Sequence, residues 1–146
     1  MDWDKLNNYQ MGWTAKNYVV EKFTSFGCDI KEPFLDTRYF DFTLRMPAGH
    51  LYQVKVSSVR GLNYIFFEKN KFKIKLSHMA VIAIYAQYEL PKLYLVPFIV
   101  WLEPNSLFVS RDYVGLKSKP EWGISLSEKN LPILEKYNFD EFIDKL

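Results

Sequence analysis

Residues 51–58, LYQVKVSS, contain the pattern from which the rest of the chain can be interpreted. Apolar side chains alternate with polar ones along this stretch, which is the two-residue period of a strand with one buried face. Gln53 and Lys55 are two positions apart, so both leave the strand on the same side. An amide and an amine together on so apolar a strand indicate either a solvated sheet face or a polar site.

The composition predicts a single folded domain over residues 1–146. Hydrophobic residues make up 49% of the chain and aromatic residues 18%, which excludes a disordered polymer. No internal repeat, low-complexity tract or linker divides the chain. The net charge of +2 argues against a broadly basic protein, so any nucleic-acid surface must come from local clustering of charge.

Several features predict a soluble cytoplasmic protein without membrane segments. Cys28 is the only cysteine, which rules out an internal disulfide framework and suits a reducing compartment. The N-terminus is polar and acidic, unlike a signal peptide. The apolar runs, such as VIAIYA at 81–86, are too short to cross a bilayer.

Hydrophobic periodicity predicts one long helix, a series of strands and a helical C-terminus. The helix covers 12–26 and ends at Gly27, strands follow at 28–31, 38–45, 51–58, 64–67, 81–86 and 92–98, and short helices follow near 127–137 and 139–146. The turn at 47–49 makes a hairpin of the strands that flank it. This order predicts an α/β (α+β) fold with a central mixed β-sheet flanked by helices.

The hairpin would bring three polar side chains to one place. Asp41 stands between two phenylalanines in the middle of a predicted strand, where an unpaired carboxylate is costly. Strand pairing would set it near Gln53 and Lys55. The simpler interpretation is a cross-strand ion pair between Asp41 and Lys55 on a solvated face.

The order of these residues also resembles a known family. FDFTL (40–44) followed by YQVKVSS (52–58) resembles the PD-(D/E)XK nuclease superfamily, the fold of many restriction enzymes and Holliday-junction resolvases. A glutamine at the acidic position is similar to the variant in small bacterial intron-encoded homing endonucleases of this fold. The resemblance covers residues 12–100 and implies a restriction-endonuclease-like sheet.

By this resemblance, Asp41 is the metal-binding aspartate, Gln53 the second metal ligand and Lys55 the catalytic lysine. The implied cofactor is Mg²⁺ or Mn²⁺, a hard cation that takes oxygen ligands. The cation polarises the scissile phosphate and lowers the pKa of a bound water. The lysine orients that water or stabilises the developing charge. Ser57 and Ser58 would donate hydrogen bonds to phosphates, or else serve ordinary turn chemistry.

Lys16 departs from the pattern of the superfamily, in which related enzymes often place a glutamate on the first helix. A helical wheel sets Lys16 within the apolar stripe that includes Val19 and Phe23. The side chain would either extend to solvent from the helix start or pair with Asp41. In the second case it would stand where a metal otherwise sits and weaken cleavage.

Basic residues after the motif form a second group of candidates for DNA binding. Arg60 follows directly, and further on lysines alternate with apolar residues, at Lys69, Lys71, Lys73 and Lys75. In an extended chain these lysines make one row, which can track a phosphate backbone. The alternative is a solubilising edge strand, since edge lysines prevent aggregation.

Three functional hypotheses follow. The first is a Mg²⁺-dependent endodeoxyribonuclease acting on double-stranded DNA, whose two cuts require a homo-oligomer, a dimer or tetramer. The second is a DNA-binding module on the same fold that has lost cleavage, as Lys16 indicates. The third is a protein-interaction domain with an aromatic surface.

Overall fold

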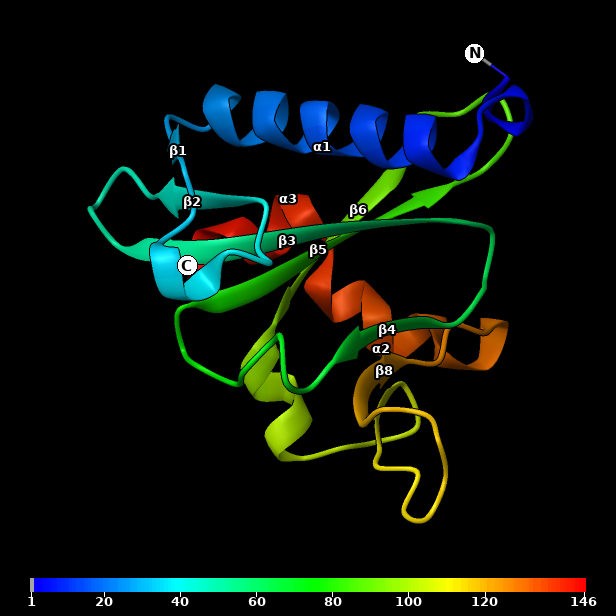
Figure 1. Ribbon diagram of the computed structural model, residues 1–146. Helices are drawn as coiled ribbons and strands as arrows, with labels where there is room; N and C mark the ends of the chain where they lie inside the picture. Colours follow the sequence, from blue (N-terminus) through cyan, green and yellow to red (C-terminus); the bar gives the residue numbers. More distant parts are fainter. Residues whose placement is uncertain (1) are drawn as a thin grey trace.

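Two β-sheets of unequal size form the framework of the chain, in a computed structural model that describes residues 2–146 (Figure 1). The strands are β1 Asp29–Lys31, β2 Phe42–Arg45, β3 Leu51–Arg60, β4 Ile65–Glu68, β5 His78–Tyr85, β6 Lys92–Pro97, β7 Phe108–Arg111 and β8 Glu121–Ile124. The five-stranded sheet has the order β1-β2-β3-β5-β6, and the three-stranded sheet has the order β4-β8-β7. Only the β3–β5 pair is parallel within the described residues. The mixed α/β class is confirmed.

Helix α1, Asn8–Ser25, begins earlier than the predicted residue 12 because a capping box precedes it. The Asn7 side chain accepts from the Gln10 N–H, and the Gln10 side chain accepts from the Asn7 N–H. The predicted end at Gly27 is confirmed. Gly27 has φ +83°, and the next residue, Cys28, donates its N–H to the Phe23 carbonyl, which is a Schellman motif.

α1 lies across one face of the five-stranded sheet (Figure 1). Its buried residues recur at every fourth position, namely Met11, Ala15, Val19 and Phe23. They pack in one cluster with sheet residues that include Phe42, Leu44, Val54, Val56, Val81 and Leu95. This spacing keeps one stripe of the helix on the sheet.

The small sheet and η3, Phe98–Leu102, cover the opposite face. Ile82 and Val96 supply apolar side chains from the large sheet to this second cluster. Trp101, 2% exposed, lies at its centre and donates its indole N–H to the Gly123 carbonyl at 3.0 Å. The two sheets are thereby joined through a dry, aromatic-rich layer.

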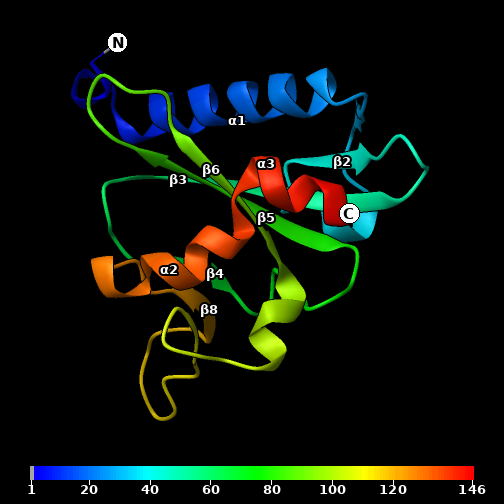
Figure 2. The ribbon, with the colours of Figure 1, turned by 180° about the vertical axis from the view of Figure 1, so that it is seen from behind.

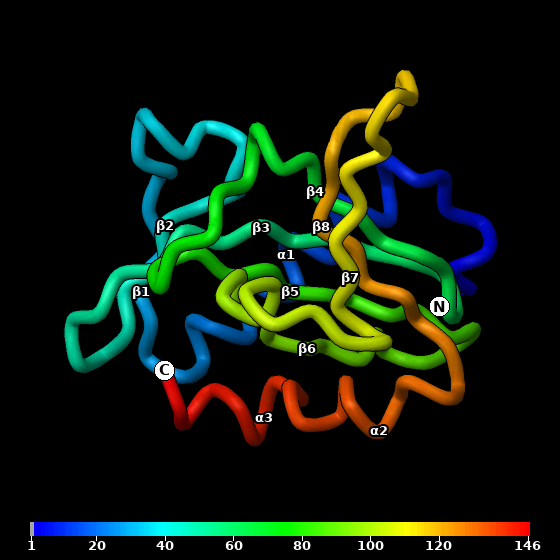
Figure 3. Tube along the Cα trace, turned by 90° about the horizontal axis from the view of Figure 1, so that it is seen from below, coloured from blue at the N-terminus to red at the C-terminus, as the bar shows by residue number. Residues whose placement is uncertain are grey.

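The C-terminal residues form the helical run that the sequence predicted. It consists of η4 Glu128–Asn130, α2 Leu131–Leu134, η5 Glu135–Tyr137, α3 Phe139–Phe142 and η6 Ile143–Lys145. Leu134 packs in the cluster of the small sheet, whereas Phe139 packs in the cluster of α1. Asn138, between them, bridges to Tyr94 on β6. The run therefore passes along the edge strand β6 from one face of the sheet to the other (Figures 2 and 3).

Two expectations about extended segments were wrong. The strand predicted over 38–45 starts only at Phe42, because the chain first makes the 3-10 turn η2, Leu35–Thr37, and a following turn. The stretch 69–77 is made of turns and irregular chain. The Glu68 carbonyl accepts from the N–H groups of Lys71 and Phe72, which reverses the chain directly after β4.

Candidate functional site

The site lies where strand β3 continues beyond its partner β2. β2 pairs only with Leu51–Val54, whereas β3 runs on to Arg60 with β5 on its other side. Asp41, the residue before β2, occupies the start of the vacated edge. Its N–H donates to the Val54 carbonyl at 2.8 Å, and its Oδ2 accepts from the Val56 N–H at 2.7 Å. The carboxylate thus takes the place of the next rung of the ladder.

Lys55 reaches the same carboxylate from the strand. Its Nζ lies 3.7 Å from Asp41 Oδ2, and the two side chains are 31% and 22% exposed. The structure therefore brings Asp41 and Lys55 together, as the hairpin predicted. The pair is half-buried at the rim of the sheet, so a bound ligand could still reach the Lys55 ammonium group.

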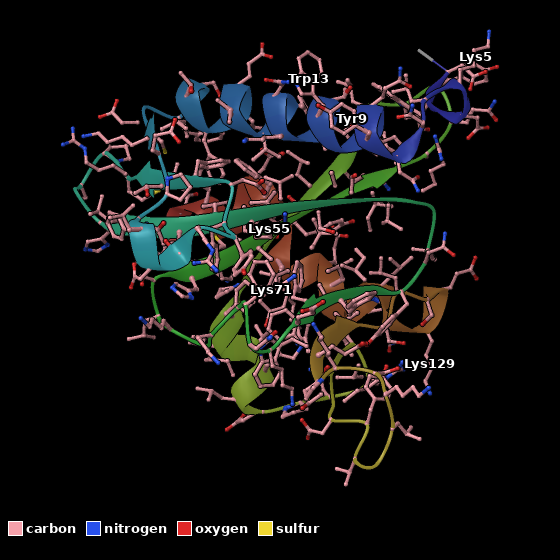
Figure 4. The ribbon with its side chains drawn as sticks, in the orientation of Figure 1. Lys5, Tyr9, Trp13, Lys55, Lys71 and Lys129 are labelled. Atoms are coloured by element: carbon pink, nitrogen blue, oxygen red, sulfur yellow. The ribbon has the colours of Figure 1, made fainter. Side chains whose placement is uncertain are left out.

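A hollow of about 390 Å³ separates this pair from α1. It is lined by Asn8, Tyr9, Gly12, Trp13, Lys16, Asp41, Lys55 and Val56. A second hollow of about 510 Å³ continues along β3 and is lined by Asn8, Met11, Ser58, Val59, Arg60 and Asn63. The two share Asn8, and together they are termed the α1–β3 groove. The groove follows the unpaired edge of β3 beside the first turns of the helix. Of its lining residues, Tyr9 and Trp13 on α1 and Lys55 on β3 are labelled in Figure 4.

Lys16 lines the groove but does not lie in the buried stripe, which corrects the helical-wheel prediction. Lys16 is exposed, and the adjacent Ala15 occupies the buried position. Among the ion pairs of residues 2–146, the partner of Asp41 is Lys55 and not Lys16. The hollow that contains Asp41 therefore holds two ammonium groups and one carboxylate, a net charge that favours an anion.

Gln53 is a buried structural residue, 2% exposed, beside the site. Its Oε1 accepts from the Thr37 hydroxyl at 2.8 Å and from the Phe34 N–H at 3.1 Å. Its Nε2 donates to the Thr43 Oγ1 at 2.9 Å, and the Thr43 hydroxyl lies 2.7 Å from the Glu32 carbonyl, to which it can donate. Gln53 thus fastens the segment before β2, and β2 itself, to β3. It does not line the hollow that contains Asp41 and Lys55.

The donor set fits a divalent cation only in part. No group of three or more His, Cys, Asp or Glu side chains suited to a metal occurs in residues 2–146. Asp41 offers Oδ1, which has no hydrogen-bond partner among the described residues, whereas the Gln53 oxygen is already bonded twice. Mg²⁺ commonly takes one or two carboxylates and completes its shell with water and substrate phosphate oxygens. Asp41 fits that mode, and Gln53 in this conformation does not.

The remaining residues predicted near the motif have structural surroundings that the sequence did not show. Ser57 and Ser58 lie within β3 rather than in a turn, and Ser58 lines the groove. Arg60 also lines it, but its Nη2 donates to the carbonyls of Trp3 and Leu6. Arg60 therefore holds the N-terminal segment against the end of β3.

The predicted row of lysines does not form. The four residues lie in turns and irregular chain after β4, at Lys69, Lys71, Lys73 and Lys75. Lys69 pairs with Asp112 at 2.7 Å, and Lys71 lies 3.5 Å from Glu68. The other two are exposed. The alternation of charge reflects burial of the intervening apolar side chains and not an extended basic ribbon.

Two aromatic residues at the groove were missed. Tyr9 and Trp13 are 82% and 64% exposed, four residues apart on α1 (Figure 4). Tyr9 lies outside the predicted helix 12–26, so the four-residue spacing was not recognised. The capping box at Asn7 and Gln10 is the signal that would have extended the helix to include it.

Comparison with protein-family models finds no match for this chain, and comparison with curated proteins finds none either. None of the helices in residues 2–146 combines the length and the apolar character needed to span a bilayer. The α1–β3 groove, lined by Asp41, Lys55 and Lys16, is the candidate site of this chain.

Proposed function

We propose that the chain is a Mg²⁺-dependent endodeoxyribonuclease of the PD-(D/E)XK type, with a restriction-endonuclease-like fold and its active site in the α1–β3 groove. The observation that supports this most is the Asp41–Lys55 pair, 3.7 Å apart, at the unpaired edge of β3. A carboxylate and an amine at this place are what such chemistry requires. Mn²⁺ would substitute for Mg²⁺.

The residues of the groove have separable roles in this proposal. The Val56 N–H fixes Asp41 Oδ2, which leaves Oδ1 to hold the cation. When bound, Mg²⁺ would polarise the scissile phosphate and acidify a coordinated water. Lys55 is placed to contact a phosphate oxygen or orient a water, and its ammonium stabilises the negative charge that develops on the phosphate. Lys16, across the groove, binds a neighbouring phosphate.

The test is the nicking of supercoiled plasmid by pure protein with Mg²⁺ or Mn²⁺. Asp41→Asn retains an oxygen for the Val56 N–H but removes the charge, and Lys55→Met retains the length of the side chain without the amine. Each is expected to lower the rate by about 10²-fold or more. Lys136→Met, an exposed lysine on η5 outside the groove, is the matched control and should cut normally.

Plasmid and linear DNA that stay intact with the wild-type protein under both metals would overturn the proposal. Cutting both strands of a duplex requires two sites, so an active enzyme should also be a dimer or tetramer by light scattering. Linear product that appears together with nicked circles would agree with paired sites.

A second candidate is a DNA-binding module on the same fold that does not cleave. Two observations favour it, since Lys16 lines the hollow of Asp41 and the Gln53 oxygen is bonded to other groups. It predicts salt-dependent DNA binding with no hydrolysis. If Lys16→Glu, which would add a second carboxylate, gains cleavage, the wild-type groove is an inactivated nuclease site.

A further inference from the structure

Tyr9 and Trp13 on α1 present two large, exposed rings beside the α1–β3 groove. Tyr88 and Phe66 are comparably exposed elsewhere, at 67% and 56%, so it is the position of Tyr9 and Trp13 beside the charged groove that sets them apart. The two rings lie between two hollows. One is the charged hollow with Lys16, and the other is an apolar hollow of about 330 Å³ lined by Leu6, Tyr9, Gln10, Trp13 and Thr14.

The pairing of an apolar aromatic surface with ammonium groups matches the chemistry of a nucleotide. A base stacks on an aromatic face whatever its identity, while its phosphate is held by lysine. Tyr9 and Trp13 line the same hollow as Lys16 and Lys55. Asp41 offsets one of the two ammonium groups, that of Lys55, so a partner with only apolar groups would leave the hollow with one excess positive charge. Charge complementarity therefore favours a ligand with anionic and aromatic parts.

The faces of the bases in a paired duplex are covered by their neighbours in the stack. A ring on a protein surface therefore reaches a base face only where a nucleotide is unpaired or has been extruded. Tyr9 and Trp13 stand on a rigid helix beside the Asp41–Lys55 pair, so a base held there places its own backbone at that pair.

We infer that the groove binds DNA at an unpaired nucleotide, whose base stacks on Tyr9 and Trp13 and whose phosphate lies between Lys16 and Lys55. The inference rests on the proposed function in taking DNA as the polymer. It adds the structural class of DNA that the groove binds. The preferred DNA is a duplex with a bulged, flapped or single-stranded nucleotide, not a fully paired one.

The test compares three labelled duplexes in Mg²⁺-free buffer: one with a single bulged nucleotide, one with an abasic residue at the bulge, and one fully paired. The abasic probe keeps the backbone and phosphate and lacks only the base. Wild type is expected to bind the bulged probe about tenfold more tightly than the abasic one, that is by ~1.4 kcal/mol. Binding should also quench the fluorescence of the exposed Trp13.

The variants are Tyr9→Ala, Trp13→Ala and Trp13→Phe, with Phe66→Ala as control. Phe66 is 56% exposed on β4 and lines neither hollow, so its loss should change nothing. Tyr9→Ala and Trp13→Ala should bind the bulged probe no more tightly than the abasic one, and Trp13→Phe should retain most of the preference. The three side chains that these variants change are exposed, so the fold should persist, which circular dichroism checks.

Equal affinity of wild type for the bulged and abasic probes overturns the inference. So does a concentration-dependent dimer that Trp13→Ala dissociates, because the rings would then be buried between copies of the chain. Cleavage without any preference for unpaired nucleotides refutes the inference and leaves the proposed function standing. Preference for the bulged base without cleavage under any metal refutes the nuclease proposal and supports the inference.

Discussion

Replacement of Gln53 by leucine separates a structural role from a metal-binding one. The side chain is 2% exposed and makes three hydrogen bonds, to Thr37, Phe34 and Thr43. Leucine fills a similar volume but removes the amide. Because these bonds hold the segment before β2 to β3, Gln53→Leu destabilises the fold whether or not a metal is present.

The size of the loss in the free energy of unfolding depends on which former partners of Gln53 can form another hydrogen bond. The Thr37 hydroxyl lies 3.0 Å from the Phe34 carbonyl and can donate there instead. The Phe34 N–H and the acceptor side of Thr43 have no such alternative among their described contacts. Two hydrogen-bonding groups are left unsatisfied, and the more apolar side chain offsets part of that cost. The expected loss in the free energy of unfolding is ~2–4 kcal/mol.

Urea unfolding at equilibrium, followed by tryptophan fluorescence and circular dichroism, measures this loss as a shift in midpoint at constant slope. Gln87→Leu is the control, because Gln87 is exposed and should change the free energy by less than ~0.5 kcal/mol. If Gln53→Leu is as stable as that control but loses Mg²⁺-dependent activity, Gln53 acts as a metal ligand and not as a structural residue.

Three further predictions concern other parts of the chain. Gly27→Ala should lower the free energy of unfolding by ~1–2 kcal/mol because Gly27 has φ +83°. Gly12 lies in the helix with open space where a Cβ would be, so Gly12→Ala should raise the free energy of unfolding by ~0.5–1 kcal/mol, and thermal melts compare the two variants. Burial lowers the pKa of the His78 imidazole, so below pH 6.5 the unfolded chain binds more protons at this residue than the folded chain does. The free energy of unfolding should therefore fall as the pH drops below about 6.5. In urea titrations at several pH values, His78→Phe should show a weaker dependence on pH. Arg60→Ala should release the N-terminal segment, seen as faster amide exchange at residues 3–7 with the sheet unchanged, at a cost of ~1 kcal/mol.

The hairpin and the Asp41–Lys55 pair were predictable because their signals are local. Alternation in 51–58 marks the strand, and the turn at 47–49 sets its partner. The two-residue period of the strand then places the Lys55 side chain on the same face as Gln53. The structure adds only the finding that Asp41 lies just outside β2, where its carboxylate bonds to the unpaired edge.

Of the small sheet, only β4 was predicted, as the strand over 64–67; β7, β8 and the pairing of the three strands were not. β4 and β8 pair Ile65 with Ile124, and β7 joins β8 from another segment. β7 and β8 have only four residues each and carry no apolar run like that of β4, so periodicity does not separate them from loops. Which strands pair when they lie far apart in the sequence depends on how the aromatic side chains pack. No local sequence pattern encodes that packing.

The assignment of Gln53 shows a second limit. Periodicity gives the face on which a side chain lies but not what covers that face. Here η2 folds over the strand and brings Thr37 and Phe34 to the amide. Tyr9 and Trp13 show the converse, since aromatic residues are usually core and only the boundary of α1 reveals these two as surface.

The C-terminal run along β6 has a consequence for synthesis on the ribosome. All five strands of the large sheet precede residue 98, so this sheet can assemble while the last third of the chain is still being made. Until residues 131–145 emerge, β6 is a bare sheet edge, and β4 has no partner before β8 arrives. The nascent chain thus passes through a stage with open strand edges, at which chaperones or slow translation would act most strongly.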